Sequence, residues 1–575
     1  MDFAEQLRIL QAARGHQALL ALATVDLAHH ALPETERARV KDALVAAAVP
    51  HWCNRDFLAA LLGATPEESD ALLTRLRALS IVEPFSARGE HSINVHEASR
   101  LVLREHLRTT DPPRWRALSE RARAHVAHSP EPHARIEALY HLFATDQPAA
   151  ATMSAALERE TASGWHPEVL STMALAVGEL SKAGWLTGEA QVEALLVPLT
   201  VRRARREAAQ FEATARQVVN LAREASYWPG LVRAQCLLGD SLLAKGRHED
   251  ALALFHDDVT ICQRCSAAAP SDVAWLHELA IAHSRVADVW ELLDRPDDAL
   301  AAFTWCLEIC QRIAEADPSN AGWRRDLGVA HSRIGGLLQK LGKLDDALAK
   351  ANEGLIIARQ LAATDPSSAA WQGDLATMHW FVAGIHQAQG RLDDALAAGR
   401  EALAICEALA EKDASNAGWQ RDLANAHSGI GTVHLEQGRF DDALAAFRTE
   451  VGIFHRIADS DPSNAEWQRN LALAHARVGD ASLSCGRFDD GLAAFLRSLD
   501  LSLDLATANP VDAVWLRDVA LAQCRVGLAL RRLAREPEAQ ARFRESVTTM
   551  ERAMTMSPGN STWEQDLASL KTWLA

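Results

Sequence analysis

The chain has few basic residues, few tyrosines and no long apolar run. Its 575 residues include only two tyrosines, and the formal net charge is −17. This balance disfavours a general nucleic-acid binder, because affinity for phosphates rests on clustered Lys and Arg. No run approaches the ~18 apolar residues that a membrane span needs, and no apolar signal-peptide core follows the N-terminus. We therefore expect a cytoplasmic protein that has no membrane partner.

Motifs of catalysis are also missing. The sequence contains no G-x-x-x-x-G-K-[ST] phosphate loop, no G-x-S-x-G nucleophile elbow and no zinc-protease helix. We expect its nine cysteines to be reduced core residues rather than a disulfide framework. We predict a protein that is not an enzyme, without catalytic residues, cofactors or metal sites.

What the chain does contain is a repeat of constant length. Tryptophans recur every 48 residues without an insertion, at Trp275, Trp323, Trp371, Trp419, Trp467, Trp515 and Trp563. Such a period predicts one supersecondary unit copied end to end. Three residues before each tryptophan stands a residue that favours a helix N-cap: Asp272, Asn320, Ser368, Asn416, Asn464, Asp512 and Asn560.

Each unit is predicted to be a helical hairpin. In the unit of Trp419, the first helix ends near Gly438, as expected for a C-cap glycine. The acidic pair Asp441-Asp442 then opens the second helix, where carboxylates complement the helix dipole. The same pair recurs in other units, so we interpret it as capping rather than acid–base chemistry.

The spacing of Gly431, Ala443 and Phe447 resembles the small-small-aromatic core of the tetratricopeptide repeat (TPR). The units are longer than the usual ~34 residues, and about seven extra residues in each helix would add ~10 Å to it. HEAT-type repeats are the alternative on length. We predict an all-α fold, an α-solenoid of tetratricopeptide-like hairpins, with seven repeats over 227–562 and a capping helix at 563–575.

The N-terminal part of the chain does not follow the 48-residue repeat. A helical segment (1–34) precedes a region (35–110) with three helices, two short extended pieces and a last helix. Over these residues, with the triplet Val95-His96-Glu97 before the last helix, the chain resembles the winged-helix domain of NB-ARC and STAND signalling ATPases. In that family the triplet histidine contacts a nucleotide phosphate held by a neighbouring ATPase domain. This sequence has no phosphate loop and so no such domain, and the resemblance leaves for His96 a contact with a nucleotide held by another chain. Residues 111–226 are predicted to be a helical bridging region of degenerate repeats.

Several regular columns imitate chemical sites. His283, His331, His379, His427 and His475 lie one per unit, and stacked hairpins about 10 Å apart cannot bring them to one metal. Cys262 of the Cys262-x-x-Cys265 pair shares one repeat position with Cys310 and Cys406. We interpret both columns as packing positions.

A binding surface remains. In tetratricopeptide arrays the first helices line a concave groove, and by register two columns are candidates for contact with a partner. The first comprises Ser284, Ser332, Trp380, Ser428 and Ala476, and the second comprises Asp288, Gly336, Gly384, Thr432 and Asp480. Trp380 departs from its column, and two placements are open: an exposed aromatic anchor, or packing against the next hairpin.

Two functions are therefore considered. The first is a non-enzymatic scaffold or sensor-adaptor, whose array binds a protein or peptide and couples it to a separate ATPase or effector chain, in a STAND-like setting such as prokaryotic defence. The alternative is a transcriptional regulator with the winged helix on DNA and the array as sensor. Arg75 and Arg77 of the candidate recognition helix stand among acidic residues, which disfavours DNA.

Overall fold

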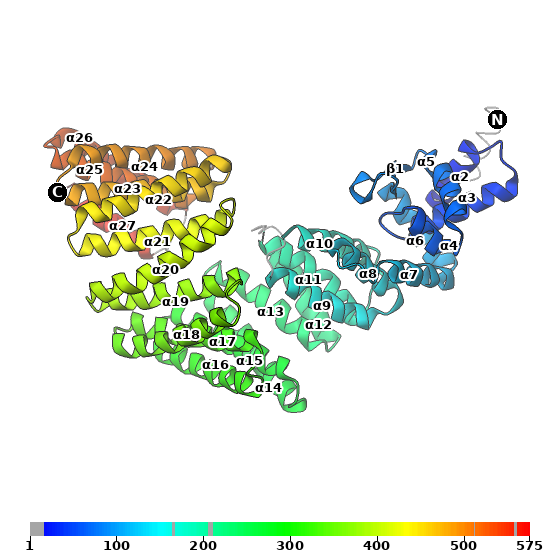
Figure 1. The fold of residues 1–575 in the computed structure, drawn as a ribbon, viewed down its shortest axis with the longest axis horizontal. Helices are drawn as coiled ribbons and strands as arrows, with labels where there is room; N and C mark the ends of the chain where they lie inside the picture. The colour runs from blue at the N-terminus through cyan, green and yellow to red at the C-terminus, as the bar shows by residue number, and fades with distance from the viewer. Residues whose placement is uncertain (1–15, 164–166, 205–210, 511, 557–560, 575) are drawn as a thin grey trace. The chain divides into compact units, whose positions relative to one another are not determined.

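The computed structural model describes residues 16–163, 167–204, 211–510, 512–556 and 561–574 (Figure 1). It divides into two compact units, residues 1–268 (unit 1) and 269–575 (unit 2), and each is described by itself. None of the helices in the described residues is both long and apolar enough to cross a lipid bilayer.

Unit 1 opens with helices around a small sheet. The elements are α2 (Gln17–Ala28), α3 (Glu34–Ala47), α4 (Arg55–Leu62), α5 (Pro66–Arg77), β1 (Val82–Pro84), β2 (Ile93–Val95) and α6 (Glu97–Thr110). The two strands are antiparallel, with Val82 opposite Val95. Thr65 caps α5 in a capping box, in which its hydroxyl accepts from the amide of Glu68 and the Glu68 carboxylate accepts from the amide of Thr65. The assignment of this region as a winged helix stays a prediction.

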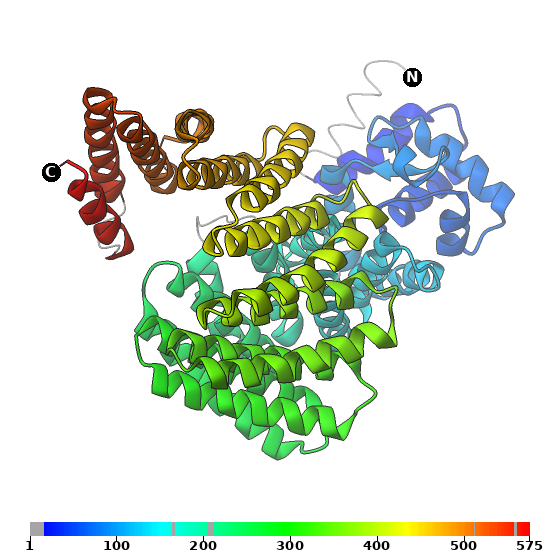
Figure 2. The same ribbon diagram turned by 60° about the vertical axis from the view of Figure 1, so that its left-hand side comes forward.

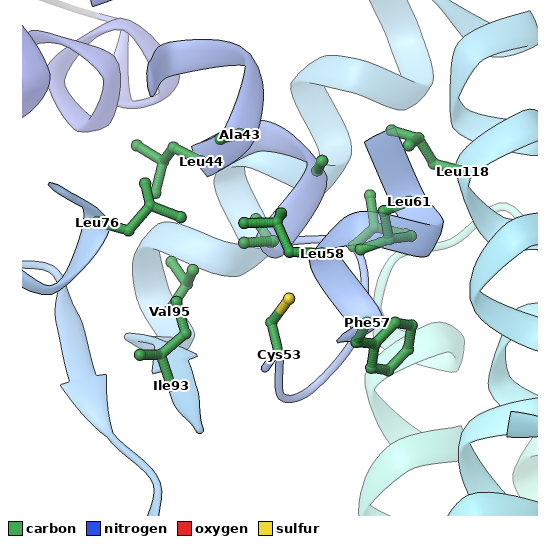
Figure 3. Close-up of a cluster of buried hydrophobic side chains, with 14 of the residues drawn as sticks. Ala43, Leu44, Cys53, Phe57, Leu58, Leu61, Leu76, Ile93, Val95 and Leu118 are labelled. Carbon is green, nitrogen blue, oxygen red and sulfur yellow. The ribbon is translucent and has the colours of Figure 1, made fainter. Parts of the chain in front are cut away.

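These elements share one apolar core. Phe57 and Leu58 of α4, Leu76 of α5 and Ile93 of β2 point toward one another around the buried thiol of Cys53 (Figure 3). The burial of these side chains ties the strands to the helices and fixes where α6 begins.

The rest of unit 1 is helical. Its helices are α7 (Pro112–Val126), α8 (Pro132–Thr145), α9 (Gln147–Ser163), α10 (Pro167–Lys182), α11 (Gly188–Ala204), α12 (Phe211–Glu224), α13 (Trp228–Leu243) and α14 (His248–Ala268). The pair α13–α14 is in phase with the 48-residue period. The boundary between the two compact units thus falls after the first hairpin of the predicted array.

Unit 2 consists of helical hairpins and a last helix. They are α15 (Val273–Leu292), α16 (Pro296–Ala316), α17 (Ala321–Lys340), α18 (Leu344–Thr364), α19 (Ala369–Ala388), α20 (Leu392–Lys412), α21 (Ala417–Glu436), α22 (Phe440–Ser460), α23 (Ala465–Ser484), α24 (Phe488–Ala508), α25 (Ala513–Arg532), α26 (Glu536–Met556) and α27 (Ser561–Thr572). The two helices of each hairpin pack together, and the second contacts the first helix of the next hairpin. Figure 2 shows this succession from green to red. The predicted all-α solenoid is confirmed.

The hairpin boundaries follow from the capping residues. The side chain of Asn416 accepts a hydrogen bond from the amide of Trp419. The equivalent residues also cap their helices: Asn320, Ser368 and Asn464 accept from the tryptophan amide, and Asp272 and Asp512 accept from the amide two residues on. Asn560 lies outside the described residues. Gly438 has φ +71°, the left-handed conformation that ends a helix, and the pair Asp441-Asp442 stands in the first turn of α22. These predictions are confirmed.

The hairpin is closed by a glycine that lies against an aromatic ring. A Cβ atom built on Gly431 of α21 would lie 2.7 Å from a ring carbon of Phe447 of α22. Phe447 is buried, and the same arrangement joins Gly527 to Phe543. The ring therefore packs on bare backbone, which lets the two helices of the hairpin approach closely.

We expect Gly431→Ala to destabilise the protein by about 1–3 kcal/mol, because the added methyl group forces Phe447 to move in a packed core. Gly452→Ala in α22 is the matched control, since a Cβ there meets no atom within 4 Å. It should be neutral or stabilising by up to ~1 kcal/mol, as alanine favours a helix interior. Urea unfolding followed by circular dichroism measures both. Equal losses in the two variants would contradict the role of the glycine.

Candidate functional site

The second candidate column is partly open to solvent. Asp288, Gly336, Gly384, Thr432 and Asp480 are each half-buried on the first helices α15, α17, α19, α21 and α23. A Cβ atom built on either glycine of this column meets no atom within 4 Å. The middle of the column is therefore a strip of helix surface with almost no side chain above it, where a partner's backbone could approach closely.

Most of the first column turns inward instead. Ser428 is 9% exposed and Ala476 2% exposed, so neither can line an open groove, and both are corrected to packing positions. Ser428 hydrogen-bonds the buried carboxylate of Glu450. The hydroxyl of Ser332 donates to the carbonyl oxygen of Gly328, and Ser284 is half-buried. Register alone could not separate the two columns, because they lie only four residues apart.

The sequence left two placements open for Trp380, and in the structure its side chain is packed rather than exposed. A Cβ atom on Gly429 of the next hairpin would lie 2.5 Å from the indole, and one on Gly399 would lie 3.1 Å from it. The ring also packs with Ile430 and Leu396. Trp380 therefore joins α19, α20 and α21 and is not an exposed anchor.

The loss of a core phenylalanine in two units explains why an aromatic residue stands at position 380. Phe447 is replaced by Gly399 in the preceding unit and by Ala351 in the one before that. Trp380 lies against Gly399, and its neighbour Phe381 lies 3.1 Å from where a Cβ on Gly335 would be. Two aromatic residues of α19 thus fill the space left by two missing phenylalanines.

Charged pairs flank the open strip at both ends. Arg333 donates to Asp288 at 3.0 Å, and Arg525 lies 3.6 Å from Asp480. Burial raises the pKa of both aspartates, while the arginines oppose the shift. Phe381 and Gly429 occupy the corresponding arginine positions in the middle, so the centre of the column is uncharged.

A second series of polar contacts, of which three are Arg–Asp ion pairs, links successive first helices. Each pair joins a basic residue to an aspartate 49 positions later: His277–Asp326, Arg325–Asp374, Arg469–Asp518 and Arg517–Asp566. Gly373 and Asn470 interrupt the series in the middle. Arg421 there pairs with its own neighbour Asp422 at 3.0 Å. We call this series the ion ladder.

The exposed tryptophan that sequence reasoning missed is Trp305 of α16. It is 57% exposed and stacks on His283, with ring centroids 6.2 Å apart. The signal was available, because the equivalent positions in other units are polar, as with Glu353 and Arg497. It was overlooked because Trp305 stands on a second helix.

The remaining candidate residues are accounted for by local structure. Burial lowers the pKa of His331, His379, His427 and His475, which favours neutral rings in the packed helices. Cys262, Cys310 and Cys406 are all buried.

The N-terminal candidates lie at the surface or in ion pairs. His96 is exposed at the start of α6. Arg75 of α5 is paired with Glu36 at 2.8 Å, and Arg77 donates to the carbonyl oxygen of His91.

Comparison with known proteins supports this architecture. The family model of the tetratricopeptide repeat matches residues 382–413, which cover the end of α19, the turn and α20. The match falls on one hairpin of the array. No curated protein sequence matches the chain.

Among solved structures, a STAND protein with a tetratricopeptide repeat sensor from Pyrococcus horikoshii is 12% identical. The match covers 97% of this chain and 67% of that one, with a TM-score of 0.51. BtubC (BKLC) from P. vanneervenii is 17% identical over 45% of this chain and 91% of its own, with a TM-score of 0.36. A Rap protein in complex with competence and sporulation factor is 14% identical over 76% and 99%, with a TM-score of 0.36. The first of these shows that the fold is shared.

We expect Trp380→Ala to destabilise the protein by about 3–5 kcal/mol, because it leaves a cavity between two hairpins. Adding Gly399→Phe should restore part of the loss, since it returns the phenylalanine that other units carry at this position. Thermal unfolding of the two variants measures both effects. If the double variant were no more stable than Trp380→Ala, the tryptophan would not be replacing the missing ring.

We expect stability to depend on pH through Glu450. Burial raises the pKa of this carboxyl to about 7 from its ordinary 4.5, although Arg477 and Ser428 oppose the shift. The folded state therefore binds the proton more tightly than the unfolded chain, and stability is lost as pH rises from ~4.5 to ~7, by up to about 3 kcal/mol. Glu450→Gln should gain stability relative to wild type between pH 5 and pH 8. Melting temperatures at the two values measure this, with the exposed Glu401→Gln of α20 as the control. A parallel pH dependence in wild type and Glu450→Gln would refute it.

Proposed function

We propose that the chain is a protein-interaction scaffold, whose array binds a protein or peptide segment along the open column of the first helices. The observation that carries this proposal is the uncharged strip at Gly336, Gly384 and Thr432 between two ion-paired ends. Repeats of the tetratricopeptide type support it, because stacked hairpins present an extended surface built of helices.

The strip favours an extended peptide or a helix as the bound segment. Bare backbone at the two glycines admits close approach of main-chain atoms. The hydroxyl of Thr432 already donates to the carbonyl oxygen of Ser428, so it presents its methyl group and an acceptor oxygen. At the ends, Arg333 and Arg525 can exchange their aspartate partners for acidic groups of the ligand.

We further propose that the array is the sensing part of a sensor-adaptor. The similar protein from P. horikoshii is a STAND protein with a tetratricopeptide repeat sensor. By analogy, the array would recognise its partner while residues 35–110 dock a separate ATPase or effector chain, in a STAND-like setting such as prokaryotic defence. The engaged arginines of α5 favour this proposal over DNA binding.

The test is capture of partners from the source cells on the immobilised full-length protein. Gly384→Arg places a long cation in the middle of the strip without a clash at its Cβ. Ala397→Arg is the matched control, because Ala397 is exposed on the second helix of the same hairpin. We expect wild type and Ala397→Arg to retain the same partner and Gly384→Arg to lose it, by quantitative mass spectrometry. Retention of the same proteins by all three would exclude the open column as the binding site.

A further inference from the structure

Unit 1 contains a cavity of about 1200 Å³ that the proposed function does not use. It lies among α6, α8 and α10, and the segment at Arg88 and the side chain of Trp52 also reach it. All its lining residues belong to unit 1. The cavity is therefore a feature of one compact unit.

The floor of this cavity is a network of buried charges. Arg100 is 7% exposed and donates to Glu179 of α10 at 3.1 Å. Arg104 is 5% exposed, pairs with the same carboxylate and donates to the hydroxyl of Tyr140 at 2.7 Å. His51 lies beside the network, with its Nε2 3.6 Å from Glu179 and its Nδ1 2.8 Å from Glu137. These contacts hold both arginines at the floor of the cavity.

The network leaves donors without acceptors. Among the described residues, Nε of Arg88, Nε of Arg100 and Nη2 of Arg104 are buried and have no hydrogen-bond partner. A guanidinium group can only donate, and an unpaired buried donor costs about 1–3 kcal/mol. The three arginines line one cavity, although these three nitrogen atoms are themselves covered. A small turn of each guanidinium group toward the cavity would let a single anionic ligand supply the acceptors.

The charge of the lining also favours an anion. Its basic residues are Arg88, Arg100, Arg104, Arg108 and Lys182, and its acidic residues are Glu97, Glu105, Glu137 and Glu179. Glu105 is already paired with Arg108 at the rim. One positive charge is left over before any histidine is counted.

The walls of the cavity are apolar. Trp52, Trp115 and Trp185 line it, and Leu175 of α10 stands at the rim with 78% of its surface exposed. A flat apolar body between these side chains would cover surface that is otherwise wet, and aromatic rings bury a large area with few torsions.

We propose that this cavity binds a small organic anion, in which a carboxylate, sulfonate or phosphate group is carried on an aromatic body. The anionic group accepts hydrogen bonds from Arg88 and Arg100, and the body lies against the tryptophans. Pockets of this kind, apolar with a few convergent polar groups, are the usual form of small-molecule sites.

Two dyes with the same aromatic body test the recognition of the anionic group separately from that of the apolar body. 8-Anilinonaphthalene-1-sulfonate carries the anion, and N-phenyl-1-naphthylamine lacks it. Fluorescence titration of the full-length protein with each dye gives two dissociation constants. Arg88→Gln should weaken binding of the sulfonate roughly tenfold and leave the neutral dye unchanged within about twofold. Leu175→Asp should weaken the binding of both dyes.

Controls keep the result interpretable. Arg135→Gln removes a cation that pairs with Glu160 and does not line the cavity, so it should change neither constant. If the melting temperature showed Arg88→Gln to be misfolded, Arg100→Gln would replace it. The proposal is overturned if the arginine variant weakens the binding of both dyes equally, or of neither. It is also overturned if Leu175→Asp leaves both dissociation constants unchanged, because the dyes would then bind elsewhere on the protein.

Discussion

The contact between a glycine of the first helix and an aromatic ring of the second is the constraint on which the array depends. Where Gly431 meets Phe447, the helices of one hairpin approach at the distance that backbone and ring allow. The constant 48-residue register keeps that contact in phase along the chain. Where the ring is missing, at Gly399 and Ala351, the neighbouring Trp380 and Phe381 fill the space. The core thus tolerates a change of residue but not an empty volume.

Much of the fold could be predicted from the sequence because its determinants are local. A cap such as Asn416, a terminating Gly438 and the pair Asp441-Asp442 act within one or two turns of a helix. The orientation of the candidate columns could not be predicted in this way. Ser428 is buried beside Glu450 of the following helix, and Trp380 is packed because Gly429 leaves room for it. Both depend on which residue the neighbouring unit presents.

The cavity of unit 1 was beyond sequence reasoning for a related reason. Arg104 and Glu179 stand 75 residues apart, and no period or motif connects them. Their pairing arises only when the fold brings α6 and α10 together at the hydroxyl of Tyr140. In a region without regular repeats, charged residues on amphipathic helices are indistinguishable from solvated ones until tertiary structure places them. Buried donors such as Nε of Arg100 can therefore be recognised only in coordinates.

The ion ladder has a consequence for how the array responds to its surroundings. Attraction between partly exposed charges is screened by dissolved salt, whereas apolar contacts are not. Its rungs, such as Arg325–Asp374 and Arg469–Asp518, add to the apolar contacts between the outer hairpins of unit 2, whereas Trp380 and Phe381 pack between the central ones. Ionic strength therefore acts unevenly along unit 2. Salt weakens the charged part of the contacts between outer hairpins and leaves their apolar part, while the central hairpins lack these rungs from the start.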